Sequence, residues 1–321
     1  MDQDVEKRRL GKTNISITPV GLGAMEFSGG KGMIGYLLSA VPPETQNEVI
    51  RISLKSGMNW IDTAELYGSG YSEMSVANGL KAAGKEPGDV VISTKWFPIL
   101  KRARSMRKSA RKSTSRLAPY PIDLYLVHMP YSVSSVRTQM KEMADLLESG
   151  LIRAVGVSNF SKDRMIKAHE VLEEWGIPLA ANQVQFSLLK RDIETNGILE
   201  AARDLGVTII AYTPLGQGVL TGKLHSDPEL LQNMPRFRRF RLRGKLEKTR
   251  SLIETLESIA LEQNATAAQI TLNWTTNYHD DTVVAIPGSS KPYQAEQNAK
   301  SMMIHLSSEQ MEAISTESLE L

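Results

Sequence analysis

Cysteine is absent from the 321 residues of the chain. Its absence excludes disulfide bonds, thiol nucleophiles and zinc sites with cysteine ligands, and it fits a reducing compartment. The five histidines do not take its place, because none of them stands at the close spacing of paired metal ligands. We therefore expect no metal site.

Long apolar runs are also missing. No stretch approaches the roughly 18 residues that a membrane-spanning helix needs, and the charged N-terminus, MDQDVEKRRLGKTNISI, lacks the apolar core of a signal peptide. The net charge is only +2, so no global field argues for nucleic acid or a membrane as partner. We expect a soluble cytoplasmic protein, with an organelle left open if a transit peptide has been removed. The oligomeric state stays unknown.

What the chain does contain is a regular series of short apolar runs. With 41% hydrophobic and 23% charged residues it has globular composition, and it is long enough to bury a large core. The runs are rich in β-forming residues and nearly continuous in apolar character, as expected for parallel strands covered on both faces. They occupy residues 16–23, 58–64, 89–96, 122–128, 152–159, 180–185, 207–214 and 282–288.

Amphipathic stretches separate these runs. Residues 43–57 have apolar side chains near helical spacing and end in Gly57, which predicts a helix C-terminus. Residues 161–176 begin with Ser161, a typical N-cap, and end at Gly176. The sequence therefore alternates predicted strands with predicted helices.

This alternation predicts an α/β protein built from right-handed βαβ units. Eight repeats of the unit predict a closed (β/α)8 TIM barrel, a single domain over residues 1–321 with long loops at its C-terminal face. A doubly wound open sheet is the main alternative. Its first turn would be GLGAME, residues 21–26, which lacks the third glycine of a dinucleotide-binding turn.

Three further segments interrupt the pattern. We expect loops at the glycine-rich residues 27–43 and at the basic residues 235–250. The second loop would attract an anionic substrate or cofactor, or form a solvated arm, and both alternatives stay open. The basic residues 100–116 predict a helix with a solvated outer face.

Polar side chains recur where the apolar runs end. They are Asp62, Lys95, His128, Asn159, Gln183 and Tyr212, and Tyr67 follows Asp62 by five residues. Each has an ordinary explanation alone: a turn cap, a lysine reaching water, a structural histidine or a packed loop aromatic. A barrel, however, brings strand ends together at one rim. Independent structural roles do not explain why so many polar side chains occur at that rim.

Four of these residues form a coherent acid catalyst. Tyrosine titrates near 10, and a nearby ammonium, here Lys95, would favour the phenolate and lower the pKa of Tyr67. Asp62 would hold Lys95 charged and in place, and His128 would hydrogen-bond a substrate oxygen. The set predicts a general acid that protonates a carbonyl oxygen after hydride delivery.

The chain resembles the aldo-keto reductase superfamily over nearly its whole length. The resemblance rests on GLGAM, WIDTAELYGSG, ISTKW, DLYLVH, GVSNF, NQVQFSLL, AYTPLGQGVLTGK and IPGSSKPYQAEQN, one motif for each expected strand and in the right order. It implies a (β/α)8 barrel that uses a nicotinamide cofactor, normally NADPH (NADP+), without a metal. The family's catalytic tetrad falls on Asp62, Tyr67, Lys95 and His128, where histidine favours reduction of C=O and glutamate would favour C=C.

The same resemblance implies a cofactor site. Ser158, Asn159 and Gln183 would bind the nicotinamide carboxamide, and Tyr212 would stack on the ring. The loop after Tyr212 would wrap the pyrophosphate with backbone amides of its glycines. The full expected set is Gly23, Ala24, Met25, Asp62, Ser158, Asn159, Gln183, Tyr212, Pro214, Leu215, Gly216, Gly218, Ile286, Gly288, Ser289, Lys291, Gln294, Gln297 and Asn298.

The adenosine end departs from the family pattern. Many members have arginine at the position of Gln294, glutamate at Gln297 and a basic residue at Gly288. Lys291 would then carry recognition of the 2′-phosphate, assisted by Ser289. NADPH remains the expected cofactor, and use of NADH is less excluded than usual.

The sequence thus predicts NADPH-dependent reduction of an aldehyde or ketone, with the proton supplied by Tyr67. Phe27, Trp96 and Met129 adjoin the tetrad and are expected to line an apolar pocket for a small carbonyl substrate. The alternative is a cofactor-sensing regulatory subunit of the same fold, such as those of potassium channels, with little turnover.

Overall fold

The structure, a computed structural model, describes residues 5–32, 40–232, 239 and 244–321. Its centre is an eight-stranded parallel sheet in the order β10-β9-β8-β7-β6-β5-β4-β3. The strands are β3 (Leu22–Gly23), β4 (Trp60–Asp62), β5 (Val91–Trp96), β6 (Leu124–Val127), β7 (Ala154–Ser158), β8 (Leu179–Gln185), β9 (Thr208–Tyr212) and β10 (Val283–Ile286).

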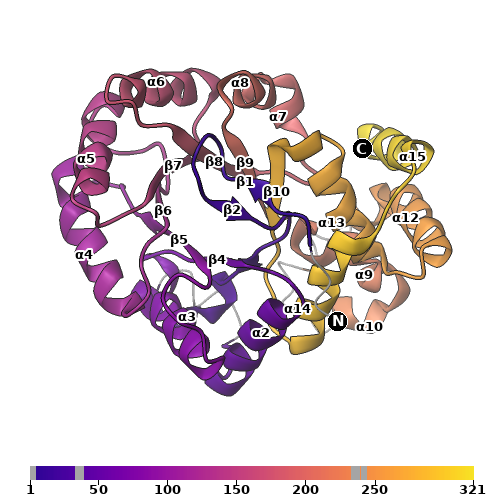
Figure 1. Cartoon of the computed structure of the whole chain (residues 1–321). Coiled ribbons are helices and arrows are strands. Elements are labelled where there is room, and N and C mark those ends of the chain that lie inside the picture. Colours follow the sequence, from indigo (N-terminus) through magenta and orange to yellow (C-terminus); the bar gives the residue numbers. More distant parts are fainter. Residues whose placement is uncertain (1–4, 33–39, 233–238, 240–243) are drawn as a thin grey trace.

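The sheet closes on itself where its two ends meet. Val20 pairs with Ala285 and Gly23 with Gly288 in parallel bridges, and the Gly23 amide donates to the Pro287 carbonyl at 3.1 Å. The result is the predicted (β/α)8 barrel, visible around its axis in Figure 1. Because the strands are parallel, all their carboxyl ends lie at one rim.

The first apolar run, predicted as one strand over residues 16–23, is divided. Residues Ser16–Ile17 form β2, which pairs antiparallel with β1 (Arg8–Arg9), and only Leu22–Gly23 joins the barrel as β3. The β1–β2 hairpin lies across one end of the barrel (Figure 1). Ile17 packs there with Trp60 and other buried apolar residues, so the hairpin plugs the amino-terminal end of the barrel.

Helices surround the barrel. The longer ones are α2 (Pro43–Lys55), α3 (Tyr71–Ala82), α4 (Met106–Leu117), α5 (Val136–Glu148), α6 (Lys162–Glu173), α8 (Ile198–Leu205), α12 (Arg250–Glu262), α13 (Ala267–Asn277), α14 (Pro292–Lys300) and α15 (Ser308–Leu319). Shorter pieces are α7 (Asp192–Thr195), α9 (Lys223–Ser226) and α10 (Pro228–Gln232). Short 3-10 turns include η1 (Met25–Ser28), η2 (Tyr67–Gly70), η3 (Ala103–Ser105) and η4 (Gly216–Thr221).

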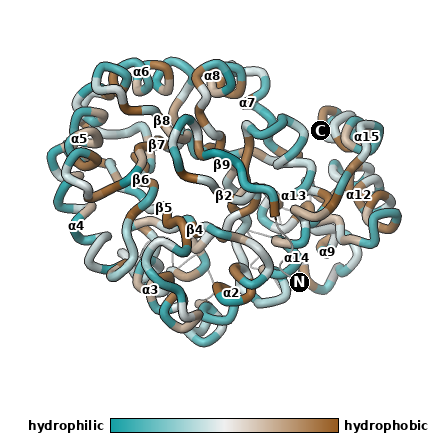
Figure 2. Tube along the Cα trace, in the orientation of Figure 1, coloured by the Kyte–Doolittle hydropathy of each residue, from teal (hydrophilic) through white to brown (hydrophobic). Residues whose placement is uncertain are grey.

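The predicted helix boundaries are close to the observed ones. The Ser161 hydroxyl accepts from the Arg164 amide at the start of α6, and Gly57 and Gly176 have positive φ angles beyond the ends of α2 and α6. Figure 2 shows hydrophilic residues along the outer faces of helices such as α6 and α8. The large apolar core lies between these helices and the sheet.

Two predicted loops fall partly outside the described residues, which omit 33–39, 233–238 and 240–243. In the first, residues 25–28 form η1 rather than a loop. In the second, residues 244–248 are helical, which corrects the loop expected there. Thr249 follows and its hydroxyl donates to the Lys245 carbonyl, so this piece leads directly into α12.

Candidate active site

The four candidate catalytic residues meet at the carboxyl rim of the barrel. Asp62 is the last residue of β4, Lys95 is the penultimate residue of β5, and His128 follows β6. Tyr67 begins η2, which leads away from β4. All four side chains are buried. Sequence order had placed them at three strand ends and one loop, and the fold brings them together.

An ion pair joins the two charged members. Lys95 Nζ lies 2.5 Å from Asp62 Oδ2 and 2.7 Å from the Thr63 carbonyl oxygen. The other carboxylate oxygen accepts from Ser93 Oγ at 2.8 Å and from Gln183 Nε2 at 2.9 Å. Burial lowers the pKa of Lys95, whereas Asp62 acts to raise it. The pair is therefore a hydrogen-bonded charge pair inside the protein.

Tyr67 lies beside this pair. Its ring centroid is 5.1 Å from Lys95 Nζ and 5.7 Å from the ring of His128, which it meets edge on. Burial raises the pKa of Tyr67 well above 10, and the charges of Asp62 and Glu26 add to the effect. The direction of the shift is opposite to the lowered pKa expected from Lys95, because desolvation of the buried phenol is the largest cause. The phenol holds its proton, as a proton donor must.

A close backbone approach fixes the position of Tyr67. Gly68 has φ +60°, and a Cβ there would lie 2.3 Å from the carbonyl oxygen of Ser28 in η1. Only glycine combines that backbone conformation with that contact. The glycine-rich loop after β4 therefore serves to hold the phenol against η1.

His128 is neutral. Burial, and then the charge of Lys95, lower its pKa to about 3. Its Nδ1 atom is buried and has no hydrogen-bond partner among the described residues. A neutral imidazole can donate a hydrogen bond from one ring nitrogen and accept one at the other.

The residues expected at the carboxamide are linked to each other. Asn159 has φ +59°, donates from Nδ2 to Ser158 Oγ at 3.0 Å and accepts from Tyr212 OH at 3.0 Å. Gln183 belongs to the Asp62 cluster. A hydrogen-bonded layer thus runs along the rim from the charge pair to Tyr212.

The residues expected to bind the cofactor phosphates also have a distinct arrangement. Gly218 has φ +93° and no atom within 4 Å of a Cβ built there, so its backbone faces open space. Ser289 is buried, and its hydroxyl accepts from Asn298 Nδ2 at 3.1 Å. Gln294 Oε1 accepts from the amides of Ser290 and Lys291, which ties its oxygen to the loop before α14.

Lys223 is a cation that the motif IPGSSKPYQAEQN did not include. Its Nζ lies 5.0 Å from the ring centroid of Tyr293, and Lys291 Nζ lies 5.9 Å from the same ring. Two cations from different elements therefore share one exposed aromatic ring. Lys223 stands at the end of AYTPLGQGVLTGK, but only the fold shows that it meets Lys291.

Two glutamates near the tetrad were also missed. Glu26 packs against Gly288, where a Cβ would lie 2.1 Å from its Oε1, and burial raises the pKa of its carboxyl. Glu65 accepts from the Phe97 amide at 2.8 Å and pairs with Lys101 at 3.2 Å. Both lie within motifs quoted from the sequence, but neither stands at a strand end. A position at a strand end was the signal that identified the other candidate residues.

The expected substrate residues differ in exposure. Phe27 and Trp96 are wholly buried in the core, and Trp96 Nε1 donates to Ser105 Oγ at 3.2 Å. Met129 is half-buried and lies next to Asn159. Phe97, whose ring centroid is 6.1 Å from that of His128, is a half-buried apolar neighbour of the tetrad. The substrate assignment stays a prediction.

Within the parts of the chain that the structure describes, no three His, Asp or Glu side chains are grouped to hold a metal ion. None of the described helices is long and apolar enough to cross a membrane.

Comparison with known proteins agrees with this barrel fold. A model of the aldo/keto reductase family matches residues 19–317. Probable aldo-keto reductase 1 of Glycine max is 29% identical, covering 97% of this chain and 88% of that protein. An uncharacterized oxidoreductase of Mycobacterium tuberculosis is 34% identical, covering 93% of this chain and 88% of that protein.

Solved structures are similar over the same length. A glycerol dehydrogenase from Gluconobacter oxydans superposes with a TM-score of 0.80 at 27% identity, covering 99% of this chain and 95% of that one. A thermostable aldo-keto reductase superposes with a TM-score of 0.78 at 28% identity, covering 97% and 99%. The fold is the (β/α)8 barrel that these structures share. The chain belongs to the aldo/keto reductase family, whose enzymes generally use a nicotinamide cofactor.

Proposed function

We propose that this protein reduces an aldehyde or ketone to an alcohol with NADPH. The observation that carries the proposal is the buried Lys95–Asp62 pair beside the protonated Tyr67 and the neutral His128. Bound NADPH would supply the hydride to the carbonyl carbon. Tyr67 would give its phenolic proton to the carbonyl oxygen, which completes the alcohol.

The other members of the tetrad support this transfer. The imidazole of His128 would hydrogen-bond the carbonyl oxygen and orient it toward Tyr67. The ammonium of Lys95 would stabilise the phenolate that remains after proton transfer, and Asp62 would keep Lys95 in position. Burial of all four side chains excludes water and strengthens each of these interactions.

The residues present fit a dinucleotide. The layer of Ser158, Asn159 and Tyr212 offers amide and hydroxyl groups and an aromatic ring for the nicotinamide. The open backbone at Gly218 offers amides for a pyrophosphate. Lys291 and Lys223, both beside Tyr293, offer charge and an aromatic surface for a phosphorylated adenosine.

The direct test is turnover. Purified protein is mixed with NADPH and a panel of small aldehydes, ketones and polyol-derived carbonyls, the last because one relative is a glycerol dehydrogenase. Oxidation of NADPH with formation of the matching alcohol supports the proposal. Tight cofactor binding without turnover on any substrate would contradict it and favour the cofactor-sensing alternative.

Replacing Lys291 with alanine should weaken NADPH binding by roughly 10- to 150-fold and change NADH binding little, because a charge-assisted bond to the 2′-phosphate is lost. Dissociation constants from titration of cofactor fluorescence measure this difference. Lys223→Ala should act in the same direction. Lys300→Ala, at the other end of α14, is the matched control. Equal weakening of both cofactors would show that Lys291 does not recognise the phosphate.

Replacing His128 with glutamate should shift the product of an enone from the allylic alcohol toward the saturated ketone. The buried site would keep the new carboxyl protonated, which makes it a stronger hydrogen-bond donor with a different shape. Products of wild type and variant are identified by mass spectrometry and NMR. A wild type that already yields chiefly the saturated ketone would overturn the role given to His128.

A further inference from the structure

The charge of the chain is distributed unevenly. Residues 90–122 contain nine Lys and Arg and no Asp or Glu. The other residues contain 29 Lys and Arg against 36 Asp and Glu, a net charge of −7. The small net charge of +2 is therefore the sum of one strongly basic segment and an acidic remainder. Such asymmetry is typical of a surface with an anionic partner.

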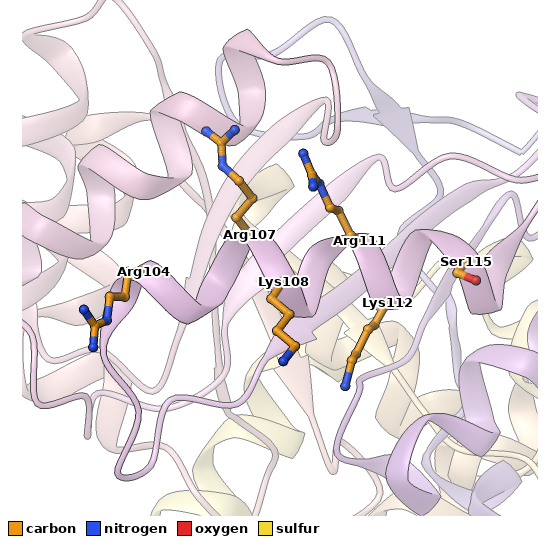
Figure 3. A pocket seen from close by; sticks show the side chains of 6 residues that line it. All are labelled: Arg104, Arg107, Lys108, Arg111, Lys112 and Ser115. Atoms are coloured by element: carbon orange, nitrogen blue, oxygen red, sulfur yellow. The ribbon is translucent and has the colours of Figure 1, made fainter.

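Most of these cations are unpaired. Lys95, Lys101 and Arg116 form ion pairs with Asp62, Glu65 and Glu73. The remaining six are exposed and form no salt bridge with any described residue: Arg102, Arg104, Arg107, Lys108, Arg111 and Lys112. We call these six residues the basic face. Five of them, with Ser115, line a surface hollow along α4 (Figure 3). None of the described residues that line this hollow is acidic.

The basic face is unfavourable for the helix that carries it. Within α4, Lys108 and Lys112 lie at i,i+4 spacing, as do Arg107 and Arg111, and like charges at this spacing destabilise a helix. Several of them also lie in the first turns of α4, where the helix dipole disfavours cations. Because both effects reverse when an anion binds, the arrangement suits an anionic surface rather than free solution.

Exposed apolar side chains lie directly before this face. Leu100 is 88% exposed and has φ +57°, a conformation that a leucine rarely adopts. Tyr131 and Val133 on the next loop are 67% and 62% exposed. The two loops are joined, since Ser132 Oγ donates to the Lys101 carbonyl at 3.1 Å and the Ala103 amide donates to Ser134 Oγ at 3.0 Å.

We propose that this corner of the barrel, the basic face with Leu100, Tyr131 and Val133, docks on an anionic lipid bilayer. Basic residues draw a protein to acidic headgroups, and neighbouring apolar side chains enter the interface; two such signals together give stable peripheral binding. This differs from the expectation of no membrane partner, which rested on the small net charge and on the absence of a long apolar run.

Nucleic acid explains the observations less well. Residues 98–119 contain no aromatic side chain on which a base could stack. A phosphate backbone would also make no favourable contact with the exposed side chain of Leu100. An acidic protein segment would account for the cations but leaves the same leucine without a role.

Docking in this way has a consequence for the site at the rim. Phe97, which precedes the exposed loop, lies 6.1 Å from His128 between ring centroids. The mouth of the candidate active site would therefore open beside the bilayer. This consequence rests on the proposed function, whereas the docking itself does not.

The test is flotation of the full chain with phosphatidylcholine vesicles that contain or lack phosphatidylserine, at low and high salt. We expect binding only with phosphatidylserine and release at high salt, because exposed charges are screened. Combined replacement of Arg107, Lys108, Arg111 and Lys112 by glutamine should weaken binding by roughly 100-fold or more, at the usual strength of a basic residue near such a surface. The matched control replaces the exposed Lys7, Lys55, Lys81 and Lys141 by glutamine, which removes the same charge.

A second variant separates the possible partners. Leu100→Ser should weaken vesicle binding several-fold and leave binding to a fluorescent DNA duplex or to polyglutamate unchanged. Circular dichroism checks that each variant is folded. The proposal is overturned if vesicles are not bound at low salt, if both quadruple variants lose binding equally, or if the duplex or polyglutamate binds more tightly than the vesicles. Vesicle binding that survives Leu100→Ser unchanged would also overturn it, since the apolar contact would then play no part.

Discussion

Tyr67→Phe should lower kcat for carbonyl reduction by about 100- to 10,000-fold, the usual contribution of a general acid. The variant loses one oxygen and its proton, while the ring that packs against His128 and Lys95 remains. We therefore expect unchanged fold and unchanged NADPH binding. Steady-state rates with an unactivated aldehyde, together with cofactor dissociation constants, measure both parts of the prediction.

Tyr71→Phe provides the matched control. Tyr71 lies four residues further on in α3, is half-buried and has a cation, Lys31, 4.3 Å from its ring centroid. It thus resembles Tyr67 in surroundings but lies away from the charge pair, so its hydroxyl should be dispensable. Near-wild-type turnover by the Tyr67→Phe variant would show that Tyr67 is not the proton donor.

The raised pKa of Tyr67 also predicts opposite pH dependence in the two directions of the reaction. Reduction needs the phenol, which is retained up to high pH because burial disfavours the phenolate. Alcohol oxidation needs the phenolate and should become faster as the pH rises. His128, with a pKa of about 3, should contribute no titration near neutral pH.

The strand ends were predictable because a buried parallel strand is marked by a short, mostly apolar run, and charged or titratable residues lie at or near the end of that run. Asp62, Lys95 and His128 each end or follow such a run, and the barrel rim brings them together. The failure at residues 16–23 has a related cause. Some apolar residues of this run belong to the β1–β2 hairpin and others to β3. Both groups are buried, so the apolar pattern does not show which element each residue belongs to.

Contacts between distant elements could not be predicted in this way. Lys223 and Lys291 belong to different motifs and meet only because both approach Tyr293. The direction of the Tyr67 pKa shift is set first by burial and then by the charges of Asp62 and Glu26. Pairwise chemistry suggested a lowered pKa, and only the three-dimensional surroundings show that desolvation is the larger effect.

The last prediction concerns stability. Lys95→Met should lower the free energy of unfolding by about 3–5 kcal/mol, because it leaves the carboxylate of Asp62 buried without its counter-charge. Asp62 would keep its bonds from Ser93 and Gln183, which offset only part of the loss. Chemical denaturation followed by circular dichroism measures the change. Lys101→Met is the control, since its pair with Glu65 is partly exposed and should contribute about 0–1 kcal/mol.

The double variant Asp62→Asn with Lys95→Met separates stability from catalysis. With both charges removed, no buried ion is left unpaired, so most of the lost stability should return. Activity should not return, because the phenolate formed at Tyr67 would have no ammonium beside it. Recovery of turnover together with stability would mean that the pair serves only to hold the fold. A double variant no more stable than Lys95→Met alone would mean that the unpaired Asp62 carboxylate is not the cause of the instability. Recovered stability without activity is the combination expected of a charge pair kept inside the barrel for its chemistry.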